Sequence, residues 1–346
     1  MNLESAYNLL NAVRPNSEST SYIEALPVKP KAFDLNVVIP CYNVEAYIGK
    51  CIESVLSQST SYSFKIIAVN DGSKDNTLDV LTKYSENPLV SVINQENKGI
   101  ARTRNVGLDN VDSDYILFLD SDDMLAPGAI DRLMNAAKKE NADIVEGSVE
   151  RVDSDGKDLN TGYYHAHTGI VSDINELFGF PLGKVFKTEL FTHVRFPDYE
   201  YEDSVNKEIV FPLAKKLYIL EDVVYKYRVN TSSISHTSLA TPKCVDSLWI
   251  NLELYKDRIE RFGLSNTQDY YEYKISTARL IYLRTFKYGR DVCKAAYTVY
   301  SSFISKEFSG YSTAKRNTKI LEWIIKKGNF TCFEMYMRLK KIIKSL

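Results

Sequence analysis

Residues 115–124 read YILFLDSDDM, in which five apolar residues run directly into a cluster of carboxylates. An apolar run without alternating polar residues is typical of a strand that is buried on both faces of a parallel sheet. The carboxylates of Asp120, Asp122 and Asp123 follow at its end and repel one another, so their clustering favours a bound cation or a row of hydroxyl groups. The stretch therefore predicts a buried strand that delivers acidic side chains to a binding site.

The chain around this strand has the same character from residue 35 onward. The short apolar runs LNVVIP (35–40), FKIIAVN (64–70) and LVSVIN (89–94) alternate with stretches of helical periodicity. Strands that alternate with helices favour an α/β fold with a parallel sheet covered on both faces. Ligands of such sheets bind beyond the carboxyl ends of the strands. At those ends this sequence has PCYN, NDGS, NQENKG and DSDD.

Each acidic turn alone has a simpler interpretation. Residues 70–73 (NDGS) could be a turn with a helix cap, and residues 120–123 could cap the helix that is expected next. Both turns, however, belong to the same expected edge of the sheet, and Arg104 lies nearby. Together they predict a cleft that offers carboxylates to a metal or to sugar hydroxyls and a guanidinium to phosphate.

Composition and charge are those of an ordinary globular protein. The 346 residues are 44% hydrophobic, which is ample for a sizeable core, and the formal net charge of −2 gives no reason to expect nucleic acid as a partner. The five cysteines are an odd number without C-x-x-C spacing, so neither a disulfide framework nor a zinc site is expected, and a reducing cytoplasm is the default location. We expect no membrane-spanning helix and no signal peptide.

Three regions are expected along the chain. Residues 1–34 should form a short helix and a linker rich in Pro and Ser, residues 35–240 the α/β domain, and residues 241–346 a helical region rich in tyrosine. Near the C-terminus, one helical face is apolar (Cys332, Met335, Tyr336, Leu339, Ile342, Ile343 and Leu346) and the other basic (Arg338, Lys340, Lys341 and Lys344). This profile fits either a peripheral helix drawn to anionic lipid, or a helix packed on its own domain or on a partner in a homo-oligomer. Both interpretations stay open.

Five segments resemble, in order, the successive signatures of glycosyltransferase family 2. They are VVIPCYNVEAYIGKCIESVLSQ (37–58), IIAVNDGSKDNT (66–77), NKGIARTRNVGL (97–108), YILFLDSDD (115–123), and GKVFKTELF with the later RFPDYEYED (183–203). The resemblance implies that residues 35–240 are a catalytic domain of the GT-A type, with a Rossmann-like, mostly parallel sheet flanked by helices. It further implies an inverting transferase that uses a nucleotide-activated sugar, a divalent metal (Mn²⁺ or Mg²⁺) and an acceptor hydroxyl as nucleophile.

The resemblance also assigns the donor side of the site. It places at the nucleotide-sugar Pro40, Tyr42, Asn43 and Glu45 (base and ribose), Asp71 (uracil), Arg104 (phosphates), and Asp120 with Ser121 (ribose or donor sugar). Asp122 becomes the metal ligand, and His236 either reaches the metal or diphosphate or is a surface or cap residue. Asn70 stands where many members carry another Asp, which leaves Asp71 as the main carboxylate of the nucleotide end.

The acceptor side rests on YEYEDSV (199–205). An inverting displacement needs a base on the face of the sugar opposite the leaving group, and such bases contribute about 10²–10⁴-fold to the rate. Asp203 matches the family's base, and Glu202 would orient the acceptor or keep Asp203 ionised. Without the resemblance, the two carboxylates would be read as a solvated helix start.

These assignments favour a glycosyltransferase that moves a sugar from a UDP-sugar to a glycan or lipid-linked glycan of the cell surface. It would act in the cytoplasm or at the inner face of the plasma membrane. Two alternatives remain: a nucleotidyltransferase, which would not need Asp203, and a non-catalytic scaffold of the same fold that binds nucleotide-sugar or glycan.

Overall fold

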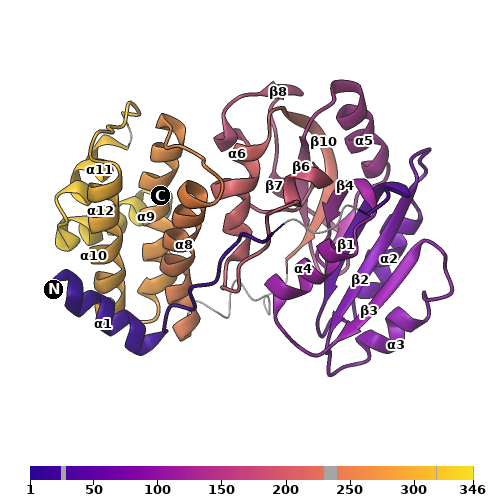
Figure 1. The fold of residues 1–346 in the computed structure, drawn as a ribbon, viewed down its shortest axis with the longest axis horizontal. Helices are drawn as coiled ribbons and strands as arrows, with labels where there is room; N and C mark the ends of the chain where they lie inside the picture. The colour runs from indigo at the N-terminus through magenta and orange to yellow at the C-terminus, as the bar shows by residue number, and fades with distance from the viewer. Residues whose placement is uncertain (25–28, 230–239, 317, 346) are drawn as a thin grey trace. The chain divides into compact units, whose positions relative to one another are not determined.

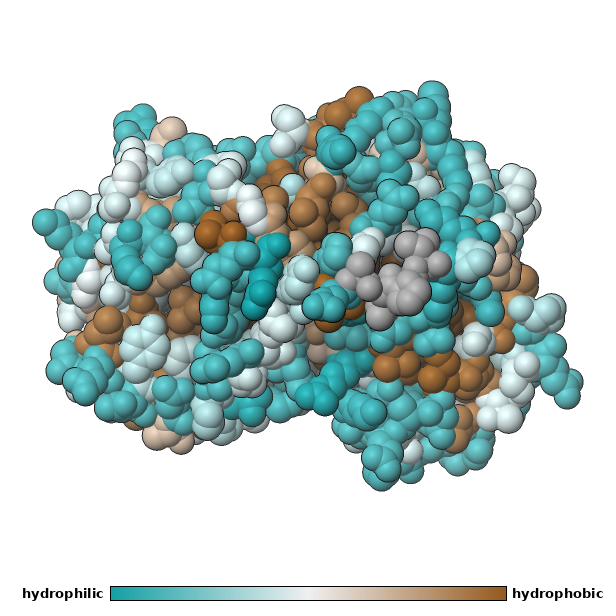
Figure 2. Space-filling model, viewed as in Figure 1, coloured by the Kyte–Doolittle hydropathy of each residue, from teal (hydrophilic) through white to brown (hydrophobic). Residues whose placement is uncertain are grey.

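The computed structural model describes residues 1–24, 29–229, 240–316 and 318–345 and divides into two compact units. The sheet unit comprises Thr20–Asp198 and Glu202–Thr231, and the helical unit comprises Met1–Ser19, Tyr199–Tyr201 and Ser232–Leu346. Figure 2 shows mostly hydrophilic side chains on the viewed surface, with hydrophobic ones among them. Within the described residues, no helix has both the length and the apolar character needed to cross a bilayer.

The sheet unit is built on one mixed sheet (Figure 1). Its strands are β1 (Phe33–Cys41), β2 (Phe64–Asp71), β3 (Val90–Gln95), β4 (Ser113–Phe118), β5 (Met124–Leu125), β6 (Ile144–Val152), β7 (Asp158–Tyr163), β8 (Gly169–Val171), β9 (Lys184–Lys187) and β10 (Leu217–Arg228). The order is β3-β2-β1-β4-β9-β6-β10-β5, with β7 beside β6 and β8 beside β10. Pairing is parallel from β3 to β4 and between β6 and β10, whereas β9 is antiparallel to both of its neighbours.

The parallel strands end at one edge of the sheet, as the sequence predicted. Cys41 of β1 pairs with Asn70 of β2, and Asp71 pairs with Gln95 of β3. Val38 of β1 pairs with Phe118 of β4, so the acidic residues that follow Phe118 also emerge at this edge. The predicted α/β class and the four predicted strands are confirmed.

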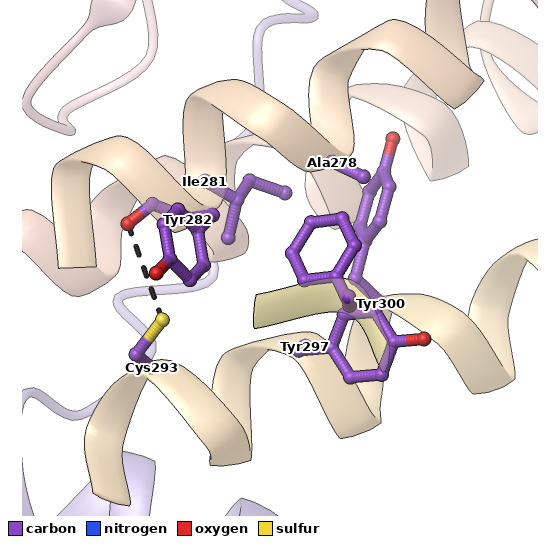
Figure 3. A pocket seen from close by; sticks show the side chains of 7 residues that line it. Ala278, Ile281, Tyr282, Cys293, Tyr297 and Tyr300 are labelled. Carbon is purple, nitrogen blue, oxygen red and sulfur yellow. Dashed lines mark hydrogen bonds between the residues drawn. The ribbon is translucent and has the colours of Figure 1, made fainter. Parts of the chain in front are cut away.

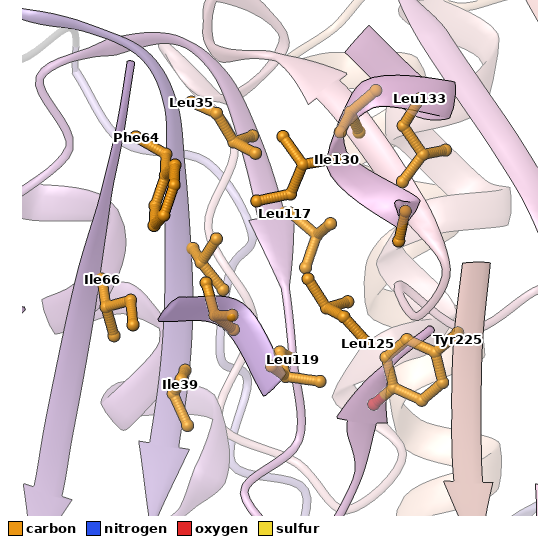
Figure 4. Packing of buried hydrophobic residues seen from close by; sticks show 14 of the residues in the cluster. Leu35, Ile39, Phe64, Ile66, Leu117, Leu119, Leu125, Ile130, Leu133 and Tyr225 are labelled. Atoms are coloured by element: carbon orange, nitrogen blue, oxygen red, sulfur yellow. The ribbon is translucent and has the colours of Figure 1, made fainter. Parts of the chain in front are cut away.

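Helices cover both faces of this sheet. They are α2 (Ile48–Leu56), α3 (Thr77–Thr82), α4 (Ile100–Asp109), α5 (Ala129–Glu140) and the short α6 (Phe211–Leu213). Figure 4 shows the core, where side chains such as Leu35, Ile39 and Leu117 of the strands meet Ile130 and Leu133 of α5. Successive strand residues point to opposite faces, so Val38 faces the other way, towards Gly107 of α4.

Gly107 sets the distance of α4 from the sheet. A Cβ at this position would collide with Val38, so only glycine allows the helix to approach this closely. Gly107 is one helical turn after Arg104, and residues three apart lie on the same face of a helix. The close approach therefore fixes the depth at which Arg104 enters the site.

The helical unit packs the N-terminal helix with the C-terminal ones. It contains α1 (Leu3–Val13), α8 (Asp246–Glu260), α9 (Gln268–Phe286), α10 (Arg290–Glu307), α11 (Lys319–Lys326) and α12 (Phe330–Ser345). Its core is largely aromatic, with Trp249, Tyr270, Tyr271, Tyr300 and Phe308 fully buried. Buried tyrosines need partners for their hydroxyls, and that of Tyr300 donates to the carbonyl of Lys274 at 2.9 Å.

A small cavity lies between α9, α10 and α12 of this unit (Figure 3). It is lined by Ala278, Ile281, Tyr282, Cys293, Tyr297, Tyr300 and Phe333. Its volume of about 10 Å³ has room for one water at most, so it is a packing imperfection and not a ligand site.

A segment of three residues shortly before the predicted base, Tyr199–Tyr201, belongs to the helical unit. The chain leaves the sheet unit after Asp198 and returns to it at Glu202. The backbone N–H of Glu200 donates to the buried Asp246 at 3.1 Å, and the guanidinium of Arg284 lies 3.6 Å from the ring centroid of Tyr201. Tyr201 has a φ of 67°, which a non-glycine residue rarely adopts, so these contacts hold the segment in a costly conformation.

Candidate active site

The site lies at the carboxyl ends of β1, β2 and β4 and begins with Asp71 at the end of β2. Its buried carboxylate accepts hydrogen bonds from the backbone N–H groups of Lys98 (2.8 Å) and Gly99 (2.9 Å) and from Nε2 of Gln95 (2.7 Å). Asp71 therefore fixes the turn that leads from β3 into α4. Its predicted contact with uracil would have to use the remaining lone pairs of the same carboxylate.

The turn after β1 carries four predicted nucleotide residues with different surroundings. Pro40 is buried in the strand, and Asn43 and Glu45 accept hydrogen bonds at 2.8 Å from the backbone N–H groups of Lys74 and Asn76. These two side chains fasten the β1 turn to the turn after β2. Tyr42 is 45% exposed, which leaves its ring open to a ligand.

Asn70, the departure from the family pattern, is directed into the protein. Its amide donates to Oδ1 of Asn94 at 2.7 Å, and its oxygen accepts from the hydroxyl of Ser73 at 2.6 Å. The neutral side chain thus joins two neighbouring strand ends, a position where a second carboxylate beside Asp71 would add repulsion.

Arg104 of α4 is the centre of the site. Its buried guanidinium pairs with Asp120 at 2.8 Å (Nη2 to Oδ1) and with Oε1 of Glu202, and it lies 5.5 Å from the ring centroid of Phe196. Burial lowers the pKa of Arg104, but the two carboxylates outweigh this effect and raise the pKa above its usual value. One cation thus joins a residue predicted for the donor side to one predicted for the acceptor side.

The three carboxylates after β4 have separate environments. Asp120 is partly exposed and pairs with Arg104, whereas Asp123 is buried and accepts from the hydroxyl of Tyr225 and the backbone N–H of Arg228, both at 2.7 Å. Asp123 therefore ties the acidic turn to β10. Ser121 between them is also buried.

Asp122 is the carboxylate left for a ligand. Among the described residues, no other residue donates a hydrogen bond to its side chain, while its carbonyl accepts from Nε of Arg228 at 2.7 Å. Burial, together with the charge of Asp120, raises the pKa of Asp122 to about 6. A nearby cation would stabilise the ionised form of this carboxylate.

A metal would have few ligands from the protein. In the described parts of the chain, no three His, Cys, Asp or Glu side chains are grouped so as to hold one. A single carboxylate fits a hard cation that takes its other ligands from diphosphate and water. Asp122 supplies such a donor, and His236, the other predicted metal residue, lies outside the described residues.

The predicted base and its neighbour lie in a 3₁₀ turn, Glu202–Ser204, followed by a π-helical turn, Asn206–Val210. Burial raises the pKa of Glu202 to about 7, against the opposing charge of Arg104 and with a further contribution from Asp203. Asp203 is only half-buried, and its carbonyl accepts from Nδ2 of Asn206 at 2.9 Å. The more exposed of the two carboxylates, Asp203, is thus the one predicted as base, and the buried Glu202 pairs with Arg104.

Sequence reasoning missed the contacts that Phe196, Tyr225 and Arg228 make in the site. Arg228 is buried and donates hydrogen bonds to the carbonyls of Asp122 and Ser154. These bonds join the acidic turn to β10 and to the turn at Ser154. Tyr225 and Arg228 belong to a strand about a hundred residues further along the chain. Their roles come from tertiary pairing, and no local signal in VVYKYR indicates them.

Comparisons with known proteins agree with this architecture. The model of the family described as Glycosyl transferase family 2 matches residues 36–194. Glycosyltransferase GlyG of Streptococcus pneumoniae is 31% identical over 226 residues, which are 59% of this chain and 73% of that protein. The chain therefore belongs to glycosyl transferase family 2.

Other relatives are longer proteins. Glycosyltransferase GlyA of Streptococcus pneumoniae is 32% identical over 58% of this chain, and the poly(ribitol-phosphate) beta-glucosyltransferase of Bacillus spizizenii is 30% identical over 60%. The chain spans only 31% and 34% of their lengths. The crystal structure of S. aureus TarS 1–349 in complex with UDP-GlcNAc superposes with a TM-score of 0.56 at 16% identity, covering 85% of this chain and 92% of that one. At that identity the likeness supports the fold alone, and it is consistent with the predicted GT-A type.

Proposed function

We propose that this chain transfers a sugar, with inversion, from a UDP-sugar to a hydroxyl of a glycan or lipid-linked glycan in cell-surface polysaccharide or glycoconjugate synthesis. The observation that carries the proposal is the buried Arg104, which pairs with Asp120 on the donor side and with Glu202 beside the candidate base. The names of two relatives support the substrate classes, since one is a poly(ribitol-phosphate) glucosyltransferase and the other was crystallised with UDP-GlcNAc. The reaction would take place in the cytoplasm, at the inner membrane face where the acceptor is lipid-linked.

On the donor side, the exposed ring of Tyr42 is free to stack on the nucleotide base, while Asn43 and Glu45 keep its turn in place. Asp71 would accept from the imide of uracil, and Asp120 with Ser121 would contact the ribose or the donor sugar. The guanidinium of Arg104 would offset the charge of the phosphates.

Asp122 would hold a divalent metal, Mg²⁺ or Mn²⁺, with His236 as a second candidate. When bound, such a cation neutralises negative charge on the departing diphosphate. The carboxylate suits this role because it is partly buried beside Asp120, where its own ionisation is costly without a cation.

On the acceptor side, Asp203 would take the proton of the acceptor hydroxyl while the oxygen forms a bond to the anomeric carbon. The bond from that carbon to the diphosphate breaks, and UDP leaves with the electron pair. Glu202 would keep Arg104 and the 3₁₀ turn in position, since it is buried and ion-paired.

The test is Asp203→Asn, which keeps the shape of the side chain but cannot accept the proton. We expect UDP-sugar affinity, measured by calorimetry, to stay near native, and transfer to fall by about 10²-fold or more through kcat. Asp198→Asn is the matched control, because Asp198 precedes the same segment and pairs with Arg102 at 2.7 Å at the surface.

The outcomes separate the alternatives. Near-native transfer by Asp203→Asn would move the base to Glu202, and a proportional loss of donor binding would make Asp203 a nucleotide or metal residue. A screen of sugar nucleotides with Mn²⁺ distinguishes the classes of activity: release of UDP supports glycosyl transfer, release of pyrophosphate indicates a nucleotidyltransferase, and binding without turnover indicates a scaffold.

A further inference from the structure

The last two helices of the helical unit have two different faces. Leu321, Ile324 and Ile325 of α11 and Phe330, Phe333 and Met337 of α12 are buried. This inner face is well packed: the hydroxyl of Tyr297 donates to the carbonyl of Ile324 at 2.9 Å, and its ring lies 4.5 Å from that of Phe333 between centroids. The helix α12 thus packs within its unit through residues that do not belong to the predicted apolar face.

The opposite face keeps large apolar side chains in solvent. Ile320 and Trp323 of α11 are 63% and 58% exposed, and Met335 and Leu339 of α12 are 59% and 61% exposed. Met335 and Leu339 belong to the apolar face that the sequence predicted, so α12 packs through a different set of residues and leaves part of the predicted face outside. Exposed apolar groups that recur on consecutive packed helices mark an interaction surface.

Within residues 311–340, the charged side chains that are exposed are all basic. Between residues 311 and 340 the only carboxylates are Glu322 and Glu334, and both are buried. Glu322 pairs with Lys326 at 3.3 Å, and Glu334 pairs with Arg290 at 3.0 Å. The acidic groups of this region are thus turned inward and neutralised.

The cations, in contrast, are exposed. Lys315, Arg316, Lys319, Lys327 and Lys340 lie in solvent, and none of them forms an ion pair with a carboxylate among the described residues. We call Ile320, Trp323, Met335 and Leu339, with Lys319, Lys327 and Lys340, the outer patch. It combines apolar side chains, an indole ring and unneutralised ammonium groups.

We infer that the outer patch binds the surface of an anionic lipid bilayer. Apolar side chains of such a helix enter the boundary between headgroups and acyl chains, tryptophan favours this interface, and lysines contact anionic headgroups. The inference concerns attachment and goes beyond the proposed transfer reaction. It does not depend on Asp203 or on the donor site.

A second copy of the chain suits this surface less well. Lysine is depleted at protein–protein interfaces, and a two-fold contact would bring the same lysines of both copies together. A polyanion in solution would satisfy the lysines but would leave the apolar groups in water. Anionic lipid satisfies both kinds of group.

Tryptophan fluorescence reports the contact directly, because the chain has two tryptophans and Trp249 is buried. The full chain would be mixed with vesicles of equal parts phosphatidylglycerol and phosphatidylcholine, and with phosphatidylcholine alone. We expect co-sedimentation and a blue-shifted emission with the anionic vesicles only, weakened by salt. In Trp323→Phe the shift should vanish while sedimentation persists.

Paired variants separate the two kinds of contact. Ile320→Ser combined with Leu339→Ser should abolish vesicle binding, and Lys319→Gln combined with Lys327→Gln should weaken it by about fivefold per lysine. Leu283→Ser is the control, since Leu283 is an exposed leucine of α9 outside the outer patch and should bind as the native chain does. Donor hydrolysis should be unchanged in all of them, which separates this inference from the proposed reaction.

Three results would overturn the inference. They are failure of the native chain to sediment with anionic vesicles, salt-dependent binding without the Trp323 shift, and a concentration-dependent dimer that Ile320→Ser disperses. The second would leave only attraction of the lysines to polyanions, and the third would assign the outer patch to another copy of the chain.

Discussion

Arg104 is a cation placed between two carboxylates that come from distant parts of the chain. Asp120 follows β4, whereas Glu202 belongs to the 3₁₀ turn almost a hundred residues later. Nε of the same guanidinium is buried without a hydrogen-bond partner among the described atoms. Breaking one half of such a buried ionic group leaves an uncompensated charge, so each member restrains the others.

The pKa of Glu202 leads to a prediction for the pH dependence of transfer. Burial raises this pKa to about 7, and only the ionised carboxylate forms the full ion pair with Arg104. We expect kcat/KM to rise with pH, by about tenfold per unit below that pKa. Glu202→Gln should flatten this limb, while Glu189→Gln at an exposed position should keep it. A native profile in Glu202→Gln would assign the limb to another group.

The raised pKa of Glu202 makes the stability of the fold decrease with pH, whereas the expected activity increases with pH. A carboxyl whose pKa is raised in the folded state binds its proton more tightly there than in the unfolded chain. Its contribution to stability is therefore complete below its ordinary pKa of 4.5 and is lost as the pH rises through about 7. Glu202 favours activity at the pH at which it favours stability least.

Asp122 carries the prediction about the metal. Asp122→Asn removes the one carboxylate of the acidic turn 120–123 that no other described residue binds, so metal-dependent affinity for UDP should fall by about tenfold or more. Calorimetry with Mn²⁺ and with EDTA measures the effect, and Asp155→Asn, on an exposed turn, is the control. Equal UDP affinity of native protein and variant in Mn²⁺, or full turnover in EDTA, would contradict a metal on Asp122.

At the residue scale, the sequence predicted where the carboxylates gather, and the family resemblance gave Asp120 and Asp122 different roles, but no pattern indicates how the surroundings of Asp122 and Asp123 differ. The apolar run before Asp120 was enough to place three acidic side chains at a sheet edge. The carboxylate of Asp123 accepts hydrogen bonds from Tyr225 and Arg228, whereas that of Asp122 does not. Both donors belong to β10, about a hundred residues further along the chain. Local pattern contains no information on such partners.

At the scale of the elements, the distance of α4 from the sheet depends on the absence of a side chain at Gly107. Gly107→Ala should force the helix away from Val38 and cost about 1–3 kcal/mol of unfolding free energy, as overpacking does. Transfer should also fall, because Arg104 moves with the helix. Urea unfolding and kcat measure the two effects.

Gly49 of α2 is the matched control for this change. A Cβ at Gly49 would meet only ordinary contacts, the nearest at 3.7 Å, so Gly49→Ala should be neutral or stabilising by up to about 1 kcal/mol. If Gly107→Ala were as stable and as active as Gly49→Ala, the close approach of α4 would not set the position of Arg104.

The predicted elements are those with strong periodicity. The predicted strand at 35–40 lies within β1, and α2 lies in one of the stretches of helical periodicity, with Ile48, Cys51, Ile52 and Val55 buried. The insertion of β9 between β4 and β6 was not predicted. KVFK is short, and its antiparallel pairing joins strands that are distant in sequence, so only the assembled sheet specifies it.

At the scale of the whole molecule, the segment before Glu202 is held by the helical unit. Asp246 accepts from the N–H of Glu200 and pairs with Arg14 at 2.8 Å. Asp246→Ala should loosen residues 199–201, and through the peptide bond from Tyr201 to Glu202 it should lower kcat by about tenfold or more without changing donor affinity. Asp269→Ala, on the exposed first turn of α9, is the control. Unchanged kcat would show that the sheet unit alone positions Glu202.

The sequence located the helical region, but not its composition as a unit. α1 packs against α10, so the first helix of the chain shares a core with helices that come more than two hundred residues later. The family model ends at residue 194 and does not include these helices. Helical periodicity shows which face of α1 is apolar, whereas the helix that covers this face is specified only by the tertiary structure.

The contacts of residues 199–201 bear on the order of events during synthesis. A ribosome completes the segments that carry Asp71, Arg104 and Asp120 long before it reaches Asp246 and Arg284, and nascent domains begin to fold as they emerge. The predicted nucleotide side can thus fold early, while residues 199–201, which directly precede Glu202, gain these contacts only after the later helices are made. A polypeptide released before α8 would retain the strand ends near Asp71 and Asp120 but lack the contacts that Asp246 and Arg284 make with residues 199–201.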